Sequence, residues 1–301
     1  MENNQKKCGF VSVIGAPNAG KSTLVNYLVG AKVSIVSPKV QTTRTRVMGI
    51  VNKEDAQVIF VDTPGIFSPR KRLDRAMVSN AWQGTSDADV ILFLVDISKG
   101  KINSDSWNIL EKLKDQKTDT ILVLNKIDTI EQDKLLKVVA ELNEKGNFTD
   151  TFLISALKGD GVDDLLTKVV GEMPESPWMF NDEQISDMPM RLLAAEITRE
   201  KIFLQLKEEL PYATTVETEE WEDFDNGSLK IRQVIYVMRD GQKGILLGKR
   251  GAQIKKIGEA SRLELEEILE RRVHLSLFVK VRENWIDDPE RYRPWGLDHN
   301  A

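Results

Sequence analysis

The sequence predicts two domains in tandem: a doubly wound α/β domain with a mostly parallel sheet, followed by a smaller α+β domain. Two observations indicate the first domain: short continuous apolar runs alternate with helix-length segments, and polar residues follow the ends of the runs. The second is indicated by a proline-marked break and a new order of helices and strands. With 301 residues and 41% hydrophobic content, the chain is long enough for two cores.

The first apolar run leads directly into a glycine-bounded loop and then a helix. The loop matches G-x-x-x-x-G-K-[ST], in which glycines let backbone N–H groups converge on phosphate oxygens and the helix N-terminus favours negative charge. We expect Lys21 to contact the β and γ phosphates and Ser22 to ligate Mg²⁺, which prefers oxygen. The expected phosphate-binding residues are Gly15, Ala16, Pro17, Asn18, Ala19, Gly20, Lys21, Ser22 and Thr23.

Further apolar runs predict the rest of the first sheet. They occupy residues 58–61, 90–95, 121–124 and 151–154, and helix-length segments occupy 131–145 and 162–172. Runs of four to six Val, Ile and Leu residues are typical of strands buried on both faces of a parallel sheet. Ligands of such sheets gather at the carboxyl ends of the strands.

A carboxylate and a glycine follow the run at 58–61. We expect Asp62 to hold Mg²⁺ through a water molecule, and Gly65 to offer its N–H group to a γ phosphate, so that this loop senses that phosphate. The nucleotide contacts predicted here are Asp62, Thr63, Pro64, Gly65 and Ile66.

The base is predicted from the residues after the run at 121–124. A carboxylate at Asp128 can accept hydrogen bonds from guanine N1–H and its 2-amino group, whereas adenine would leave the charge unpaired. We expect Asn125 to brace the loop and approach the purine, and Lys126 to lie along the base plane. The predicted base contacts are Asn125, Lys126, Ile127, Asp128, Ser155 and Ala156, the last two closing over the guanine oxygen.

A polar loop at 37–46 contains two threonines, either of which could complete the magnesium shell. Its T-T-R motif resembles that of the translation-factor-like class of GTPases, and the resemblance implies Thr43 rather than Thr42. The catalytic residues that it implies are Lys21, Thr43 and Gly65.

Two positions bear on the rate of hydrolysis. Residue 66 is isoleucine, where Ras-like enzymes carry a water-orienting glutamine, so we expect slow intrinsic hydrolysis. Asn18 is similar to the asparagine that binds K⁺ in potassium-stimulated GTPases; the alternative is a simple turn residue.

The second domain follows a break at Met173-Pro174. A helix is predicted over 190–210 and strands over 213–220 and 228–238. A G-K-R-G loop and a helix with an apolar face come next, and then a final alternating strand. This order resembles a type II KH domain, in which the loop clamps single-stranded RNA and an adjacent groove reads base edges. The resemblance implies RNA contacts by Gly248, Lys249, Arg250, Gly251, Lys255 and Lys256.

Net charge is −5 overall, but it is unevenly distributed. Residues 177–227 hold 4 basic and 13 acidic side chains, whereas 228–301 hold 15 and 11. A single cysteine, Cys8, excludes a disulfide framework and a cysteine-built zinc site. With no apolar run of transmembrane length and no room for a signal peptide, we expect a soluble protein of the bacterial cytosol.

From residue 8 to about 290 the chain resembles the Era family of ribosome-assembly GTPases, including the R-E-K stretch at 199–201 and E-E-L-P-Y at 208–212. The expected parts are a GTPase domain (8–174), a linker (175–189), a type II KH domain (190–285) and a tail (286–301). The family implies GTP and GDP as ligands, Mg²⁺ and K⁺ as cofactors, and binding to the 3′ end of 16S ribosomal RNA in 30S subunit assembly. It also implies a monomer with peripheral inner-membrane association.

Two other functions stay open from the residues. One is an RNA-binding module with an almost inert nucleotide site, and it predicts no nucleotide-dependent change in RNA affinity. The other is a GTP-dependent RNA-modifying enzyme, for which the sequence offers no catalytic constellation beyond the nucleotide site.

Overall fold

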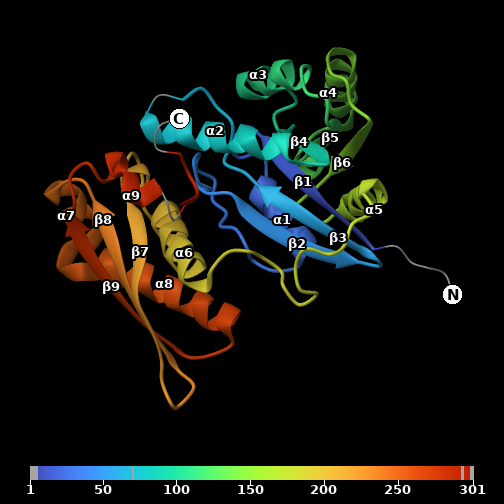
Figure 1. Cartoon of the computed structure of the whole chain (residues 1–301). Helices are drawn as coiled ribbons and strands as arrows, with labels where there is room; N and C mark the ends of the chain where they lie inside the picture. The colour runs from blue at the N-terminus through green and yellow to red at the C-terminus, as the bar shows by residue number, and fades with distance from the viewer. Residues whose placement is uncertain (1–5, 70, 293–294, 299–301) are drawn as a thin grey trace. The chain divides into compact units, whose positions relative to one another are not determined.

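The computed structural model describes residues 6–69, 71–292 and 295–298. These residues form two compact units, each with its own sheet (Figure 1). The first unit comprises the described residues of 6–34, 43–187 and 295–298; the second comprises 35–42 and 188–292. The loop that contains Thr42 and Thr43 is thus divided between the two.

The first unit contains a six-stranded sheet in the order β2-β3-β1-β4-β5-β6. Its strands are β1 (Lys7–Gly15), β2 (Val47–Lys53), β3 (Ala56–Asp62), β4 (Val90–Asp96), β5 (Asp119–Asn125) and β6 (Asp150–Ile154). All neighbouring strands are parallel except β2 and β3, which form an antiparallel hairpin. The predicted mostly parallel sheet is confirmed, while β2 was not predicted.

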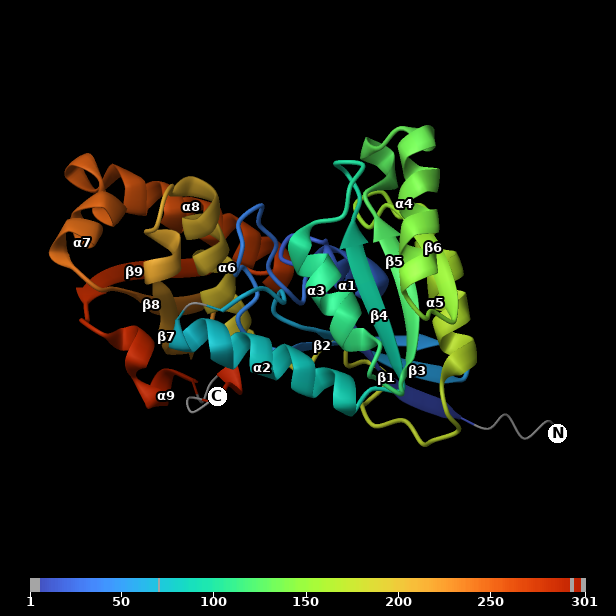
Figure 2. The same ribbon diagram turned by 90° about the horizontal axis from the view of Figure 1, so that it is seen from above.

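Helices cover both faces of this sheet (Figures 1 and 2). They are α1 (Lys21–Val29), α2 (Arg72–Ser86), α3 (Ser104–Leu113), α4 (Gln132–Lys145) and α5 (Val162–Glu172). Apolar side chains of α2, α3 and α4 form one core with those of β1, β4 and β5. Helices α1 and α5 cover the other face, which gives the doubly wound arrangement expected from the alternating pattern.

The second unit has a three-stranded sheet in the order β7-β8-β9. Its elements are α6 (Met190–Gln205), β7 (Thr215–Asp223), β8 (Leu229–Val237), α7 (Asp240–Leu247), α8 (Ala252–Leu269), β9 (Val273–Val281) and α9 (Pro289–Tyr292). Strands β7 and β8 are antiparallel and β8 and β9 parallel, and side chains of α6, α7 and α8 fill the core on one face. Among the described residues, no helix combines the length and the apolar character needed to cross a bilayer.

The first helix of this unit is shorter than predicted. It was expected over 190–210 but ends at Gln205, because Leu206 adopts an extended conformation (φ −102°, ψ 156°). Because the chain leaves the helical conformation after Gln205, both Leu206 and Leu210 can be buried in the core of the second unit. Tertiary burial therefore ends the helix before Pro211 can do so.

Trp285, the last residue of the predicted KH domain, lies in the second unit, whereas Trp295, in the predicted C-terminal tail, lies in the first. In the second unit, the indole of Trp285 is buried and donates a hydrogen bond to the carbonyl oxygen of Ala213 (3.1 Å). In the first unit, the Thr45 hydroxyl donates to the carbonyl oxygen of Trp295 (2.8 Å), whose ring is also buried. Trp285 and Trp295 therefore each complete the packing of one unit.

Candidate nucleotide site and nucleic-acid interface

The loop between β1 and α1 admits only glycine at its two ends. A Cβ on Gly15 would lie 2.3 Å from the carbonyl oxygen of Leu94, and one on Gly20 would lie 2.2 Å from Nδ2 of Asn125. Gly20 also has a φ of 100°, which side chains rarely tolerate. The carboxyl ends of β4 and β5 therefore pack tightly against the backbone of 15–20, which precedes helix α1.

Lys21 lies inside this loop rather than in solvent. Its side chain is buried, and its ammonium donates to the carbonyl oxygens of Gly15 (3.2 Å) and Ala16 (3.1 Å). Burial lowers the pKa of Lys21 to about 8, although the nearby Asp62 carboxylate opposes the shift. The loop thus holds a desolvated cation where the sequence predicts phosphate.

Three side chains predicted to bind magnesium lie together beside α1. The Ser22 hydroxyl donates to Oδ2 of Asp62 (2.6 Å) and lies 2.9 Å from Oγ1 of Thr43. Oδ2 also accepts a hydrogen bond from Ser34 (2.7 Å), a residue that no sequence pattern indicated. The other oxygen, Oδ1, is buried without a hydrogen-bond partner, and burial raises the pKa of Asp62. Two hydroxyls beside a carboxylate with one unpaired oxygen fit Mg²⁺, a hard cation.

The two candidate threonines have different environments. The Thr42 hydroxyl donates to the carbonyl oxygen of Lys39 (2.7 Å) and lies 2.6 Å from the hydroxyl of Ser37. Thr43 instead faces Ser22. Both threonines are buried, not exposed as in an ordinary polar loop. The geometry favours Thr43 as the one that joins the candidate magnesium shell.

Gly65 lies directly against the phosphate loop. A Cβ there would be 2.8 Å from Cα of Pro17, and the next N–H group, of Ile66, donates to the carbonyl oxygen of Gly15 (3.1 Å). The Ile66 side chain is buried in the apolar core that contains Ile14. Position 66 therefore contributes to packing and has no polar group that could orient a water molecule.

Asn125 joins three loops of the predicted site. Its Nδ2 donates to the carbonyl oxygen of Ala19 (2.8 Å), and its Oδ1 accepts from the N–H groups of Lys126 (2.8 Å) and Ala156 (2.9 Å). The bracing role predicted for Asn125 thus has a physical basis. Because the N–H of Ala156 is paired with Asn125, it is not free to close over a guanine oxygen in this arrangement.

The ammonium of Lys126 is fixed at the edge of the same site. It donates to the carbonyl oxygen of Asn18 (2.9 Å) and to Oδ2 of Asp96 (2.5 Å). Burial raises the pKa of the Asp96 carboxyl, but hydrogen bonds from Lys126 and Ser98 outweigh burial and hold that pKa below its usual value. Asp96 was missed by sequence reasoning; its position at the carboxyl end of β4, the expected edge of the sheet, could have indicated it.

Asp128 follows Lys126 in a short 3₁₀ turn, with its carboxylate 3.7 Å from the ammonium of Lys158. Lys158 lies three residues after Ser155, whose hydroxyl accepts a hydrogen bond from the Lys158 N–H (3.2 Å). The predicted base-binding residues are thus brought together. Of the other predicted contacts, Ala16, Ala19, Thr63 and Pro64 are buried, and Thr23 and Ile127 are partly buried.

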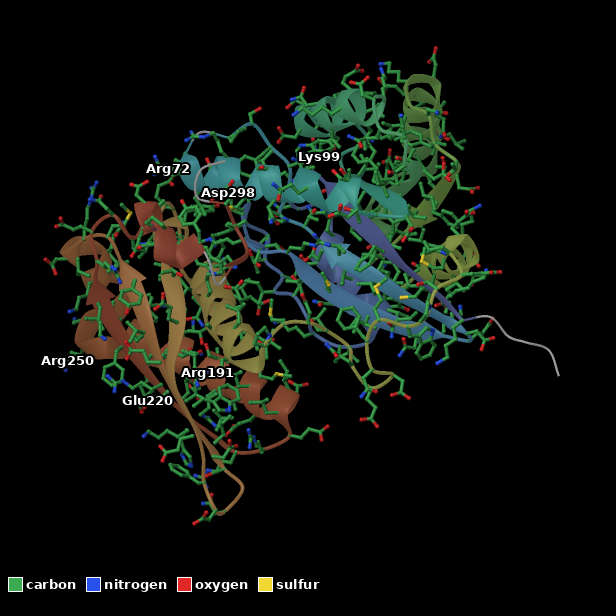
Figure 3. All side chains as sticks on the ribbon, viewed as in Figure 1. Arg72, Lys99, Arg191, Glu220, Arg250 and Asp298 are labelled. Carbon is green, nitrogen blue, oxygen red and sulfur yellow. The ribbon has the colours of Figure 1, made fainter. Side chains whose placement is uncertain are left out.

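In the second unit, the G-K-R-G loop joins α7 to α8. Gly248 (φ 72°), Arg250 (φ 53°) and Gly251 (φ 78°) all have positive φ angles, and a Cβ on Gly248 would lie 2.6 Å from Cβ of Gln253. The side chains of Lys249 and Arg250 are exposed, and Arg250 lies at the periphery of the unit (Figure 3). The loop therefore presents two cations over a backbone that can be approached closely.

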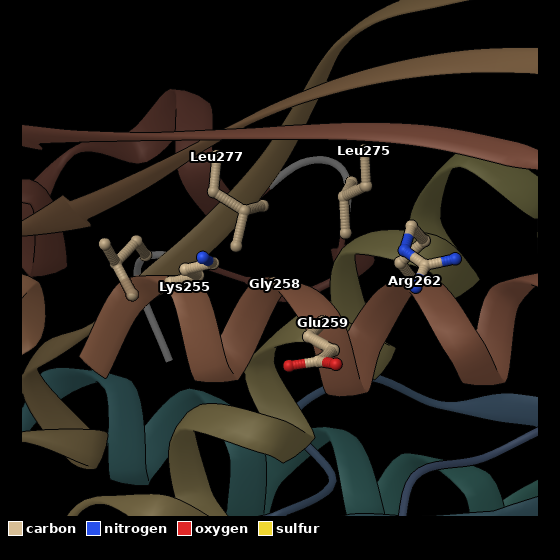
Figure 4. A pocket seen from close by; sticks show the side chains of 7 residues that line it. Lys255, Gly258, Glu259, Arg262, Leu275 and Leu277 are labelled. Carbon is tan, nitrogen blue, oxygen red and sulfur yellow. The ribbon is translucent and has the colours of Figure 1, made fainter. Parts of the chain in front are cut away.

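A groove runs beside this loop, between α8 and β9 (Figure 4). It has a volume of about 460 Å³ and is lined by Ile254, Lys255, Gly258, Glu259, Arg262, Leu275 and Leu277. One wall is therefore apolar and the other carries charged side chains. Such a surface suits a flat aromatic ring with polar edges, and Lys255, predicted from sequence, lies in it. The predicted Lys256 is exposed but does not line this groove.

The R-E-K stretch lies on α6, where it contacts the loop segment 35–42 of the same unit. Buried Arg199 forms an ion pair with Glu196 and donates to the carbonyl oxygen of Thr42. Next to it, Glu200 accepts from the N–H of Val36 (2.8 Å). The residues directly before Thr43 are therefore held by hydrogen bonds to α6.

Two family models match the chain. A model described as a 50S ribosome-binding GTPase matches residues 10–126, and a KH domain model matches 209–286. GTPase Era of Agrobacterium fabrum is 60% identical over 292 residues, which cover 97% of this chain and 92% of that protein. The chain belongs to the Era family of GTPases. The resemblance inferred from the motifs is confirmed, as are the predicted α/β GTPase domain and the C-terminal KH domain.

Solved Era structures match nearly the whole chain. Era in complex with MgGDPNP and nucleotides 1506–1542 of 16S ribosomal RNA superimposes with a TM-score of 0.91 at 42% identity, covering 97% of this chain and 99% of that one. A variant of Aquifex aeolicus Era bound to GDP and AlF₄⁻ superimposes with a TM-score of 0.90, also at 42% identity, covering 96% and 99%.

Proposed function

We propose that this protein is a GTP-hydrolysing switch that binds the 3′ end of 16S ribosomal RNA through its KH domain and acts in 30S subunit assembly. The observation that carries the proposal is the groove between α8 and β9, which opens beside a two-cation glycine loop in a chain that also brings Ser22, Thr43 and Asp62 together at the predicted nucleotide site. Support also comes from the Era structure that contains both MgGDPNP and a 16S RNA fragment.

In this proposal the nucleotide site acts mainly by positioning and charge. Lys21 neutralises the β and γ phosphates, exchanging its carbonyl partners for phosphate oxygens. Ser22, Thr43 and, through water, Asp62 would hold Mg²⁺, which neutralises phosphate charge when bound. The N–H of Gly65 senses the γ phosphate, and Asp128 accepts hydrogen bonds from guanine.

Hydrolysis is slow in the proposed mechanism, because Ile66 is buried and offers no group that orients water. We assign to Asn18 the binding of K⁺ at the edge of the loop, where the cation supplies charge in place of an arginine finger. The exposure of Asn18 supports this assignment.

The RNA contacts are assigned to the loop and the start of α8. Gly248 and Gly251 permit close backbone approach, Lys249 and Arg250 meet phosphates, and Lys255 extends the basic surface along the groove. Lys256, exposed on α8, is assigned to the RNA backbone outside the groove.

The remaining assignments come from the sequence patterns and the family resemblance. They are the boundaries 8–174, 175–189, 190–285 and 286–301, a monomeric state, and a cytoplasmic location with peripheral attachment to the inner membrane. Co-sedimentation with inner-membrane vesicles and light scattering test the last two.

The deciding experiment measures the affinity of the full chain for a 16S 3′-end oligonucleotide, with GDP and with a non-hydrolysable GTP analogue. A switch binds the RNA more tightly in the analogue-bound state. A scrambled oligonucleotide of the same length is the control for specificity, and the salt concentration is kept constant.

One competing function has a specific observation in its favour. The packed position of Ile66 is compatible with an RNA-binding module whose nucleotide site is almost inert. That function predicts equal RNA affinity in the two nucleotide states, so the same measurement separates the two.

A further inference from the structure

Three hydrogen bonds join the loop segment 35–42 to helix α6 within the second unit. The bonded pairs, with the loop residue first, are Val36 with Glu200, Lys39 with Phe203, and Thr42 with Arg199. The three positions on α6 lie within about one turn of the helix. A segment with no helix or strand of its own is therefore attached to α6 near its start, in its middle and at its end.

The bond from Arg199 is the most deeply buried of the three. The Arg199 side chain is enclosed, and its guanidinium forms an ion pair with both carboxylate oxygens of Glu196 on the same helix. Burying an ion pair sacrifices solvation, which hydrogen bonds of good geometry must offset. The carbonyl oxygen of Thr42 accepts one such bond, so release of the loop would remove a partner from an enclosed charge. The ion pair and the loop therefore stabilise each other.

Contacts inside the segment fix its shape as well. The Thr42 hydroxyl donates to the carbonyl oxygen of Lys39 (2.7 Å) and lies 2.6 Å from the hydroxyl of Ser37. Gln41 has a φ of 58°, in the left-handed region that residues other than glycine rarely adopt. Such a conformation persists only where the surrounding contacts hold it. The direction in which the chain leaves Thr42 is thus set by this turn and by the bonds to α6.

Thr43 comes next in the chain, and its hydroxyl lies 2.9 Å from that of Ser22 in the candidate magnesium site. Consecutive Cα atoms are about 3.8 Å apart, so a displacement of Thr42 moves Thr43 as well. We propose that Arg199 is a positioning residue for GTP hydrolysis, which holds Thr42 so that the Thr43 hydroxyl reaches the magnesium shell. The inference rests on the proposed role of Thr43, and it gives the first helix of the second unit a part in the reaction.

The test removes the ion pair without leaving a buried charge. Glu196→Leu and Arg199→Met are introduced together, because apolar side chains of similar size can replace a buried pair with little loss of stability. The full chain is titrated with Mg²⁺ in the presence of a fluorescent, non-hydrolysable GTP analogue. The apparent Mg²⁺ affinity should fall by about tenfold or more, as when a group that orients a metal ligand is lost.

A second readout follows the loop without nucleotide or metal. In the double variant, hydrogen–deuterium exchange of the peptide that covers residues 36–43 should become about tenfold faster or more. Lys39→Met, which leaves no buried charge, should change both readouts in the same direction by about threefold, the effect of one hydrogen bond. Lys39→Arg should behave like the unaltered chain, because arginine retains a donor at this position.

Arg191→Met is the matched control on the same helix. Arg191 is exposed and donates to the carbonyl oxygens of Thr218 (3.3 Å) and Glu219 (3.0 Å), both in β7. Its substitution should leave Mg²⁺ affinity and loop exchange unchanged. Equal effects of Arg191→Met and the double variant would overturn the inference, since any disturbance of α6 would then be sufficient.

Thr43→Ala separates this inference from the proposed function. Alone it should lower Mg²⁺ affinity by about tenfold, and adding the double variant should lower it no further, because both changes act through one hydroxyl. If Thr43→Ala leaves Mg²⁺ affinity unchanged, the proposed ligand set is wrong, and the inference with it. If Thr43→Ala lowers it while the double variant and Lys39→Met do not, the inference is wrong and the proposed function stands. Additive losses also overturn the inference, because Arg199 would then act by another route.

Discussion

The two ligand-binding loops of this protein use the same local structure in opposite ways. Each is a glycine-bounded turn that leads into a helix: residues 15–20 before α1, whose first residue is Lys21, and residues 248–251 before α8. In the first, Lys21 is buried and bound to loop carbonyls; in the second, Lys249 and Arg250 are exposed. The first loop can enclose the end of a small ligand, and the second can only touch the side of a long one.

Because the first loop is enclosed and the second is exposed, different physical factors control ligand binding at each. Charges inside the first loop interact in a medium of low polarity, so protonation and exact hydrogen-bond matching decide binding. Charges on the second loop are screened by salt, so ionic strength and the number of phosphate contacts decide binding.

The enclosed site should discriminate bases strongly through Asp128. Asp128→Asn should lower GTP affinity by about 10⁴-fold and raise affinity for XTP, because an amide can donate to the carbonyl at C2 of xanthine. Competition binding with GTP and XTP measures both changes. Asp133→Asn, at an exposed position of α4, is the matched control. Unchanged selectivity for GTP would mean that Asp128 does not contact the base.

The exposed loop should lose affinity uniformly when its charges are reversed. Changing Lys249 and Arg250 together to Asp should weaken binding to the 16S 3′-end oligonucleotide by about 10²-fold or more, and lower the slope of log affinity against log salt by about 2. Fluorescence anisotropy at several salt concentrations measures both. GTP affinity should not change.

The matched control for the Lys249 and Arg250 variant reverses the charge of two exposed lysines of the first unit, by changing Lys117 and Lys137 together to Asp. Their variant should bind the RNA with the same salt slope as the unaltered chain. If the control weakens binding as much as the loop variant does, the loop is not the RNA contact.

The enclosed lysine should make nucleotide binding depend on pH. Burial lowers the pKa of Lys21 to about 8, so the empty site loses this proton above that pH, whereas the phosphate-bound site retains it. GTP affinity should therefore be level below pH 8 and fall by up to about tenfold per pH unit above it. In the empty chain, stability should rise between about pH 8 and 10.5, because the unfolded lysine still binds its proton there.

Calorimetry in buffers of different ionisation enthalpy measures the proton taken up on binding. Uptake at pH 8.5 and none at pH 6.5 is the expected result. Equal proton release or uptake at both values would show that Lys21 stays charged in the empty loop.

The smallest effect concerns the edge of the enclosed site. Replacing Na⁺ by K⁺ at equal ionic strength should raise the rate of GTP hydrolysis by less than about tenfold, and Asn18→Gly should abolish this increase. Glycine is the suitable variant because Asn18 has a φ of 63°, which glycine adopts without strain. Equal rates in the two salts would exclude the cation model.

Much of the architecture followed from local patterns. The strands that end at Asp62 and Asn125 are continuous apolar runs, and their polar termini could be assigned to one edge because parallel strands share a direction. The glycines at 15, 20, 248 and 251 were recognisable because each motif needs a backbone that other residues obstruct or avoid. Features of this kind can be predicted because they depend on residues that are consecutive in the sequence.

Other features depend on residues that are distant in the chain. The pairing of Ser34 with Asp62 and the early end of α6 at Gln205 left no local signal, and the bridge from Lys126 to Asp96 was indicated only by the position of Asp96 at the carboxyl end of β4. Each arises because the fold brings side chains from different elements into a low-polarity space, where every polar group needs a partner.

Residue type and spacing within a few positions were sufficient to predict most of the elements, the phosphate loop and the family, and they indicated Asp128 as the carboxylate expected to contact guanine. Only the tertiary structure showed that Thr43 contacts Ser22 whereas Thr42 donates to Lys39, and only it placed Ser34 against Asp62. Both are questions of which atoms lie within a few ångströms of each other across separate segments, and spacing along the chain does not contain that distance.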